Sequence, residues 1–151
     1  MLDDVDRRIL RQLQADPTLT MPELAERART TPARAARRVE RLEAEGVIRG
    51  REAVIDWAAL GFAVHVSLRI TVDKAAPRAL DELMAAARKV PEVVELQTFL
   101  GRVDLRLAVL ARDMGHYQEV YRDRILTLPH IADIEALLTL SVVKDADEVP
   151  V

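Results

Sequence analysis

The chain has 151 residues, 50% of them hydrophobic and 31% charged, a composition that predicts a soluble globular protein of one domain or two small ones. It contains no cysteine, which excludes a disulfide framework, a thiolate nucleophile and a cysteine-based zinc site. Its formal net charge of −3 excludes a generally basic surface, so any contact with nucleic acid must use a local patch.

The N-terminal segment predicts two helices before residue 30. Apolar residues recur at three- and four-residue spacing behind an aspartate N-cap, and they predict a first helix to about Gln14. Thr20 and Glu23 have the spacing of a capping box and predict a second, short helix to about Ala28. The first ten residues mix both charge signs without an apolar run, so we expect neither a secretory signal nor a transit peptide.

A third helix is predicted from Pro32 to Glu45, between the start signal Thr31 and the stop signal Gly46. One side of this helix is apolar and another is cationic. The cationic side carries Arg34, Arg37, Arg38 and Arg41. Residues 27–51 hold eight arginines against three glutamates, a charge of +5, which leaves −8 for the rest of the chain.

Two interpretations of these arginines are open. Arginines on an exposed helix face can serve solubility alone, and Arg41 can pair with Glu45 four residues later. Arg38, by contrast, has no acidic residue three or four positions away on this helix. Because Arg34 and Arg38 also repel each other at that spacing, stabilisation explains the face poorly, and we favour function, above all for Arg37 and Arg38.

Residues 47–56 alternate around Arg49-Gly50-Arg51 and predict a small β-hairpin with glycine at its tip. Three helices and such a hairpin form a winged helix-turn-helix, whose third helix enters the major groove of double-stranded DNA. Hydroxyl groups at the helix start would donate to phosphates, and arginines would reach phosphates or base edges. The candidate DNA contacts are Thr30, Thr31, Arg34, Arg37, Arg38, Arg41, Arg49 and Arg51.

Helical periodicity gives way to two-residue alternation near the middle of the chain. We therefore expect a DNA-binding domain over residues 1–56, a linker over 57–62 and a second domain over 63–151. The longest charge-free stretch, Trp57 to Leu68, has 12 residues, whereas a membrane-spanning helix needs roughly 20. We expect a cytoplasmic protein without a membrane span.

The second region predicts strands and helices in the order βαββαβ. The expected elements are a strand over residues 62–71, a helix over 77–89, strands over 93–100 and 103–111, a helix over 113–129 and a strand over 134–142. Only Gly101-Arg102 separates the two middle strands, so a tight hairpin is expected. This order is that of the ferredoxin-like split unit, and the whole chain is predicted to be α+β.

One face of the predicted sheet must be covered by the two helices, and the other is mixed in character. Arginines fall on the first and third strands and glutamates on the second and fourth, so pairs could form across a 4-1-3-2 sheet. A homodimer that packs sheet against sheet would explain this face, and a solvated monomeric face is the alternative. Its expected residues are His65, Ser67, Arg69, Glu95, Gln97, Phe99, Arg106, Ala108, Leu110, Glu135, Leu137 and Thr139.

The sequence does not favour an enzyme or a metal protein. His65, His116 and His130 fall on a strand, a helix start and a loop, and no third ligand is expected to converge on any of them. No nucleophile elbow, phosphate loop or dinucleotide fingerprint is present, so no cofactor is expected. A competing class is a sensing or oligomeric scaffold whose helix-turn-helix contacts protein.

The stretch "LDDVDRRILRQLQADPTLTMPELAERARTTPARAARRVERLEAEGVIRG" is followed by Leu60-Gly61 and then by "PEVVE", "GRVD" and "LPHI". In this order the motifs resemble the leucine-responsive (Lrp/AsnC) family of prokaryotic transcription regulators over nearly the whole chain. The resemblance implies a sequence-specific DNA-binding regulator with a ferredoxin-like ligand and assembly domain. It also implies homodimers that often associate further, for example to octamers, and an amino acid or related molecule as effector.

In that family the effector lies between subunits near a G-x-x-D hairpin turn, which Gly101 and Asp104 match here, and Met114 matches a position beside the same cleft. Arg51 stands where many relatives have an aromatic residue, and Arg102 where many have a small or acidic one. These departures leave the operator sequence and the ligand class open, and a regulator that needs no effector is an alternative. Gly101 and Asp104 also have a purely structural alternative, as a turn glycine and a hairpin-stabilising carboxylate.

Overall fold

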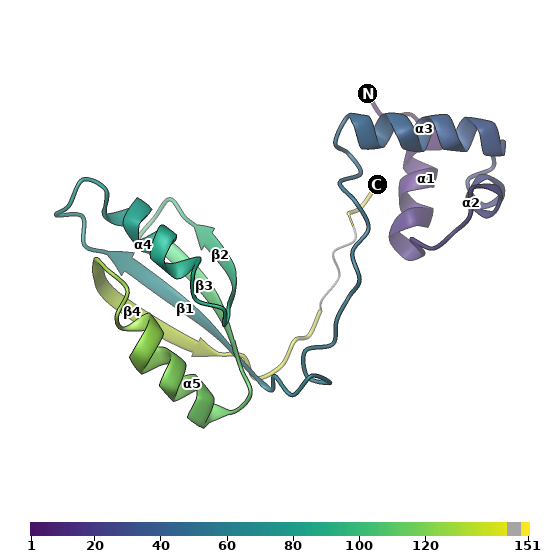
Figure 1. The fold of residues 1–151 in the computed structure, drawn as a ribbon. Helices are drawn as coiled ribbons and strands as arrows, with labels where there is room; N and C mark the ends of the chain where they lie inside the picture. The colour runs from purple at the N-terminus through teal and green to yellow at the C-terminus, as the bar shows by residue number, and fades with distance from the viewer. Residues whose placement is uncertain (145–148) are drawn as a thin grey trace. The chain divides into compact units, whose positions relative to one another are not determined.

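The computed structural model describes residues 1–144 and 149–151, and the chain divides into two units. The first unit comprises Met1–Val54 with Lys144–Val151, and the second comprises Ile55–Val143. None of the helices in the described part of the chain is long and apolar enough to cross a membrane. Figure 1 shows the helices of the first unit in purple and blue and the mixed helix and sheet layers of the second in teal to yellow.

The first unit is a three-helix domain, as predicted. Its helices are α1 (Asp4–Ala15), α2 (Met21–Arg27) and α3 (Pro32–Ala44). The three starts use side-chain caps: Asp3 and Thr20 each form a reciprocal capping box, and the hydroxyl of Thr31 accepts a hydrogen bond from the backbone N–H of Arg34. Because these groups satisfy N–H donors that a helix leaves unpaired, the predicted start signals for α2 and α3 are confirmed.

A small apolar core holds the three helices together. Its most buried members are Ile9, Leu19, Leu24, Ala25, Ala28, Ala35, Val39 and Leu42. Fully burying a leucine or isoleucine side chain contributes about 1.5 to 3 kcal/mol, so a cluster of this size stabilises only a small domain. The side chain of Arg8 on α1 adds a polar tie, since its Nε donates to the carbonyl of Ala28 at 2.9 Å.

The predicted hairpin of the wing is wrong, because no residue from 47 to 56 belongs to a strand. Gly46 adopts a φ of 71° and the backbone N–H of Val47 donates to the carbonyl of Leu42, an arrangement that closes α3. Beyond this stop Ile48 packs against the helical core, but the later apolar side chains of the segment are exposed, and Val54 is 98% exposed. A two-stranded ribbon without a third strand or an apolar face to rest on is marginally stable, which explains why sequence alternation alone does not form one here.

The C-terminal residues group with the first unit rather than with the predicted second domain. The Gln14 amide donates to the carbonyl of Val149 at 3.2 Å and accepts from the N–H of Val149 at 2.6 Å. The guanidinium of Arg11 also donates to the carbonyl of Val151. The division at Val54 and Ile55 likewise lies ahead of the expected linker, so residues 57–62 belong to the second unit.

The second unit has the predicted order βαββαβ. Its elements are β1 (Val64–Val72), α4 (Ala79–Ala87), β2 (Val93–Thr98), β3 (Leu105–Ala111), α5 (Met114–Val120) with the π-helical segment η1 (Tyr121–Ile125), and β4 (Ile131–Leu138). The strands form one antiparallel sheet in the order β2-β3-β1-β4, which is the predicted 4-1-3-2 order. The ferredoxin-like α+β arrangement is confirmed.

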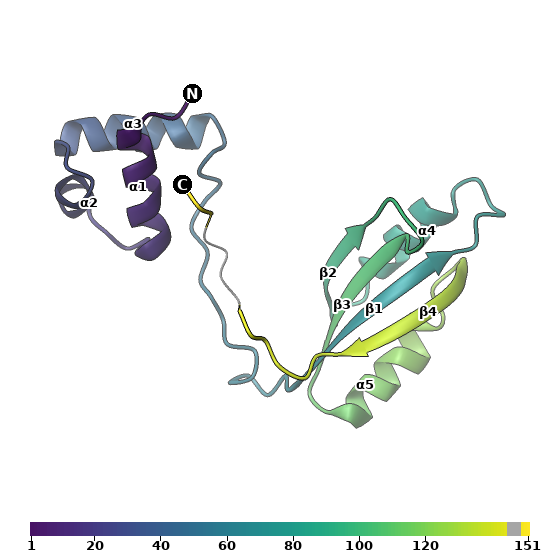
Figure 2. The same ribbon diagram turned by 180° about the vertical axis from the view of Figure 1, so that it is seen from behind.

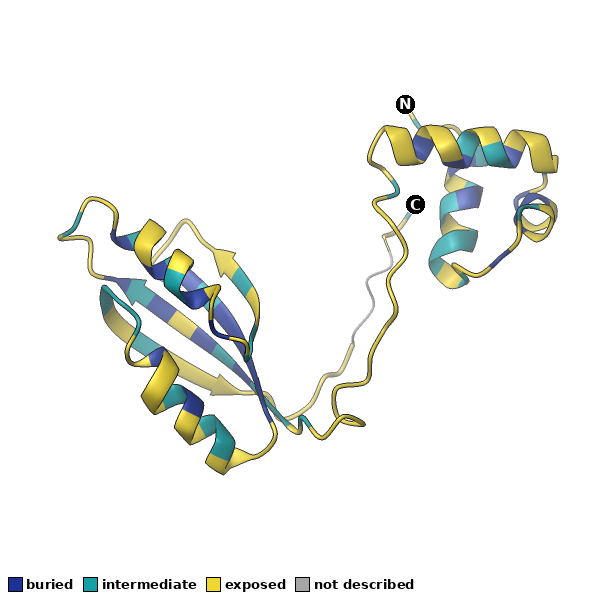
Figure 3. Cartoon of the chain, viewed as in Figure 1, coloured by how far each residue is buried: buried dark blue, intermediate teal, exposed yellow. Residues whose placement is uncertain are grey.

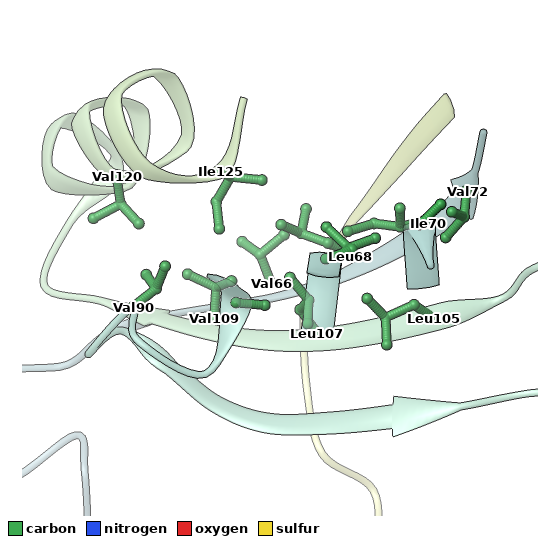
Figure 4. Close-up of a cluster of buried hydrophobic side chains, with 13 residues drawn as sticks. Val66, Leu68, Ile70, Val72, Val90, Leu105, Leu107, Val109, Val120 and Ile125 are labelled. Atoms are coloured by element: carbon green, nitrogen blue, oxygen red, sulfur yellow. The ribbon is translucent and has the colours of Figure 1, made fainter. Parts of the chain in front are cut away.

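Both helices of this unit cover one face of the sheet (Figure 1), and the view from behind shows the strands of the opposite face (Figure 2). Every second residue of β1 from Val66 to Val72 is buried, and Figure 3 shows this alternation along the strand. These residues meet Leu105, Leu107 and Val109 of β3 beneath the helices (Figure 4). The core therefore lies between the sheet and the helix layer, and neither helix of this unit covers the other sheet face.

The connection between β2 and β3 is longer than predicted. The backbone N–H of Phe99 donates to the carbonyl of Asp104 and closes the hairpin, so the loop has four residues, 100–103, in place of two. The N–H of Asp104 instead donates to the carbonyl of Ile70 on β1. This bond to a third strand opens the turn, which the residues between the two middle strands cannot reveal by themselves.

Candidate nucleic-acid interface and ligand site

Helix α3 presents an apolar face to the core and an arginine face to solvent. Ala35, Val39 and Leu42 are buried against α1 and α2. Arg34 and Arg37 are exposed, and together with Arg38 they line a shallow surface hollow. Within residues 1–144 and 149–151, neither Arg34 nor Arg37 forms an ion pair. These two guanidinium groups are therefore available to a ligand.

Arg38 differs from its neighbours because α1 supplies its acidic partners. Its Nη1 lies 2.6 Å from Oδ2 of Asp3 and 2.7 Å from Oδ1 of Asp6. The Arg38 side chain is only 28% exposed. The functional interpretation of Arg38 considered acids on its own helix alone, and the structure adds two acidic partners from the first helix.

Arg41 has the same anchor. Its Nη2 lies 2.7 Å from the second carboxylate oxygen of Asp6, whose side chain is fully buried. Burial alone raises the pKa of Asp6, but hydrogen bonds from the backbone of Asp3 and from Arg38 and Arg41 outweigh it and lower the pKa to about 2. One buried carboxylate thus holds two arginines of α3 and fixes this helix against α1.

Asp6 is a residue that the sequence analysis missed. It lies on the apolar side of α1, one turn before the buried Ile9. A charged residue within an apolar stripe is a signal in itself, because a charge is buried only with partners. The arginine-rich side of the third predicted helix could have supplied those partners.

The start of α3 brings hydroxyl groups close to the free arginines. Thr31 is exposed and caps the helix, with its Oγ1 3.4 Å from the N–H of Arg34, and its own hydroxyl hydrogen remains available to donate. Thr30 is half-buried in the preceding turn. The positive end of the helix dipole adds to the attraction for an anion at this end.

Arg49 and Arg51 are not held beside this cluster. They lie in the extended segment after α3, beyond the end of the helix opposite to Thr31. A helix of 13 residues is about 20 Å long, so these arginines start from a different place on the surface. Both are exposed, and without the hairpin no local framework orients them.

In the second unit, Asp104 is buried and its carboxylate already forms a hydrogen bond and an ion pair. Its carboxylate accepts a hydrogen bond from the N–H of Val72 at 3.0 Å and lies 2.8 Å from Nζ of Lys74. The ammonium group of Lys74, followed by the Val72 N–H, lowers the pKa of Asp104 below its ordinary value. The carboxylate therefore joins the start of β3 to the end of β1, a structural contact with a different strand from the hairpin partner β2 that the structural alternative named.

The three predicted effector contacts do not meet within one chain. Gly101 and Asp104 precede β3, whereas Met114 follows it, and a strand of seven residues spans about 23 Å. Gly101 is exposed, and a side chain added there would meet no atom within 4 Å. Met114 is 46% exposed at the start of α5. A site that uses all three must draw them from different subunits.

A surface hollow of about 270 Å³ lies next to Asp104. It is lined by Val72, Lys74, Ala76, Pro77, Ala79, Leu80 and Asp104. The Lys74–Asp104 pair forms its polar wall, and aliphatic side chains form the remainder.

The three histidines lie apart, on β1, in α5 and in the loop before β4. His65 packs edge-on against Trp57, His116 accepts a hydrogen bond from the N–H of Arg112, and His130 lies 2.6 Å from Glu82. Across the described residues, no three histidine, aspartate or glutamate side chains gather as a metal ion would require.

The helix-free sheet face carries the predicted pairs. Arg69 of β1 lies 3.5 Å from Glu135 of β4, and Arg106 of β3 lies 2.9 Å from Glu95 of β2. Arg69 and Arg106 face each other across the central strands, an unfavourable contact that these outer acids offset. The mixed character expected for this face is confirmed.

Comparisons with known proteins agree with both units. The model of the Lrp/AsnC ligand-binding domain matches residues 65–149, and a winged helix-turn-helix DNA-binding model matches residues 2–49. The leucine-responsive regulatory protein of Salmonella typhimurium is 31% identical over 97% of this chain and 89% of its own length. That of Escherichia coli K12 is 30% identical over the same shares.

Solved structures are similar over nearly the full length. A transcriptional regulator from Neisseria meningitidis, in complex with L-methionine, is 27% identical with a TM-score of 0.92, over 99% of this chain and 97% of that one. An AsnC family regulator from Agrobacterium tumefaciens is 31% identical with a TM-score of 0.89, over the same shares. A feast or famine regulatory protein from M. tuberculosis, complexed with L-methionine, is 28% identical with a TM-score of 0.85, over 99% of both chains.

Proposed function

The chain belongs to the Lrp/AsnC family of transcriptional regulators, and on that premise we propose how its own residues bind DNA, assemble and respond to an effector. It is a DNA-binding regulator and not an enzyme, and a scaffold whose helix-turn-helix contacts protein is not favoured. A regulator of prokaryotic transcription meets its operator in the cytoplasm, where we place this chain.

We propose that the N-terminal end of α3 enters the major groove with Arg34 and Arg37 as its principal contacts. This proposal rests on the difference between the two pairs of arginines on α3. Asp6 forms ion pairs with Arg38 and Arg41. Arg34 and Arg37 are exposed beside the capped start of the helix. Thr30 and Thr31 supply donors for phosphate at the same end. Arg38 can still contact DNA through its Nε and Nη2, in an orientation that Asp6 fixes. Arg41, Arg49 and Arg51 attract the DNA backbone through their charge alone.

The experiment begins with a DNA duplex that the wild-type chain selects from a random-sequence pool. A dimeric reader should protect two half-sites whose centres are about 34 to 36 Å apart or a multiple of that spacing. Absence of any selected sequence, or protection of a single half-site, would contradict the proposal.

We further propose that the helix-free sheet face joins two chains. Its centre is built from small residues, Ser67 and Ala108, which face each other across β1 and β3 and let a second sheet approach closely. The arginine and glutamate pairs that flank them can exchange partners with a symmetric copy. A unit of about 90 residues gains stability by covering this face, and further association to octamers would use other surfaces.

The effector that we propose is an amino acid held between subunits. L-methionine is bound in two of the similar structures, and this chain offers an exposed loop at Gly101, the carboxylate of Asp104, and the exposed, adaptable Met114. Because β3 separates these groups within one chain, one subunit would supply the loop and Asp104 and its neighbour Met114. Binding that favours one assembly state changes DNA affinity by linkage.

Thermal unfolding in the presence of each standard amino acid tests the effector. We expect L-methionine to raise the unfolding temperature of the wild type, and the gain to fall when Met114 is replaced by alanine, an exposed change that leaves the core intact. A ligand that stabilises wild type and the Met114→Ala variant equally would place the site elsewhere.

A further inference from the structure

Arg29 adopts a backbone conformation that side chains rarely accept. It lies in the turn between α2 and α3 with a φ of 56°, and within the described residues only His130 shares a positive φ among non-glycine residues. The left-handed region crowds the Cβ atom of an L-residue against its own backbone. Glycine, which lacks that atom, occupies such positions without strain.

The hydrogen bonds of the turn impose this conformation. The N–H of Thr30 donates to the carbonyl of Ala25 at 2.9 Å, and the N–H of Arg29 donates to that of Glu26 at 3.1 Å. Together these are the 6→1 and 5→2 hydrogen bonds of a Schellman motif, in which the residue after the C-cap, here Arg29, must adopt the left-handed conformation. The turn sets the direction of α3, so Arg29 cannot relax without moving that helix.

The fold itself gains little from an arginine at this position. Arg29 is exposed, and among the residues that the structure describes its side chain makes no hydrogen bond or ion pair. Positive charge near the C-terminus of α2 is already supplied by Arg8, which donates to the carbonyl of Ala28, and by Arg27. A further cation here adds repulsion to a strained backbone, so an arginine at this position points to a role outside the fold.

We propose that Arg29 is a DNA contact of this chain, a phosphate-binding arginine that the strained turn places at the entrance of α3. It precedes the capping residue Thr31 by two positions and lies at the same end of α3 as Arg34. In a helix-turn-helix the turn before the recognition helix faces the DNA backbone, where an arginine binds phosphate without reading a base. This assignment rests on the proposed function and extends it to a residue that the arginine pattern of α3 does not include.

Strain and function act in opposite directions on this residue, and Arg29→Gly separates them in the full chain. Removing the strain should raise the unfolding temperature by about 2 to 4 °C. Removing the phosphate contact should lower DNA affinity and reduce the slope of log K against log salt by about 0.9, with the selected duplex as probe. The matched Arg29→Lys variant keeps the charge and the strain, and we expect it to retain the wild-type slope and stability.

A glycine variant that binds the duplex with wild-type affinity and slope overturns the assignment. So does a loss of stability, because Arg29 would then serve the fold. A wild-type chain that binds no duplex contradicts the proposed function itself and is distinguished from both results by the absence of any binding to compare.

Discussion

The buried carboxylate of Asp6 lies 2.7 Å from Nη1 of Arg38, a contact that joins α1 to α3 across 32 positions of the chain. Arg41 shares the same carboxylate, also at 2.7 Å. A buried charge is tolerated only where partners replace its water, and here both partners come from the helix that we propose for the major groove. The angle of that helix therefore depends on a residue that never approaches DNA.

Replacing Asp6 by asparagine should destabilise the first unit by about 3 kcal/mol, because a neutral amide cannot hold two guanidinium groups: Arg41 loses its ion pair and Arg38 keeps only Asp3. Urea unfolding measures the loss. Asp4→Asn is the matched control, since Asp4 is exposed in the same helical turn and its removal should cost about 0.5 kcal/mol. Equal losses in the two variants would mean that the Asp6 ion pairs do not stabilise the fold.

The same carboxylate makes stability depend on pH. The pKa of Asp6 falls from an ordinary value of 3.8 to about 2 in the folded chain, so its contribution is complete above pH 4 and is lost as the pH falls through 2. We expect the stability difference between wild type and Asp6→Asn to shrink by about 2 kcal/mol between pH 4 and pH 2. Carboxylates outside this cluster titrate in both proteins and cancel in this difference, and Asp3, which shares Arg38 with Asp6, is replaced by asparagine in both proteins. A difference that stays constant over this range would show that Asp6 has an ordinary pKa.

Local signals in the sequence were sufficient for the architecture. The capping pairs at Thr20 and Thr31 and the two-residue alternation of the strands depend on neighbours in the chain, so they predict the elements and the sheet order correctly. The predictions of the wing hairpin and of the two-residue turn were wrong, because each structure depends on a further segment of the chain. No segment covers Val54, and the carbonyl of Ile70 accepts a hydrogen bond from the N–H of Asp104.

The candidate site was predicted less well than the fold, for a related reason. Periodicity placed four arginines on one side of α3, but it could not tell the two that Asp6 anchors from the two that stay free. That distinction requires the packing of α1 against α3. The left-handed turn at Arg29 is equally invisible, since an arginine carries no turn signal.

The sheet face should determine assembly. Arg106→Glu places a carboxylate beside Glu95 and removes the pair at 2.9 Å, so we expect a dimer of the wild type to dissociate into monomers. Light scattering at micromolar concentration measures the mass. Arg88→Glu makes the same charge change at the exposed end of α4, on the helix side, and should leave the mass unchanged. A wild type that is itself monomeric would refute the sheet-to-sheet dimer.

Lys74 should compete with the amino group of an effector for the carboxylate of Asp104, because Nζ of Lys74 lies 2.8 Å from that carboxylate. If the effector uses this carboxylate, Lys74→Met should tighten L-methionine binding, while Asp104→Asn, which can still accept from Val72, should weaken it. Isothermal titration measures both. Unchanged affinity in the two variants would leave Asp104 with its structural role only.

We expect Arg34 and Arg37, which the Asp6 anchor leaves free, to bind DNA through the N-terminal end of α3. The affinity of Arg34→Ala/Arg37→Ala for the selected duplex across a salt series tests this, with Arg88→Ala/Lys89→Ala as a control that removes the same charge from the second unit. Loss of two phosphate contacts should reduce the slope of log K against log salt by about 1.8, and the control should keep the wild-type slope. If one of the two arginines reads a base, the slope should fall by about 0.9 and discrimination at one position by about 1 to 3 kcal/mol. Wild-type slope, affinity and discrimination in the Arg34→Ala/Arg37→Ala variant would show that neither arginine binds DNA.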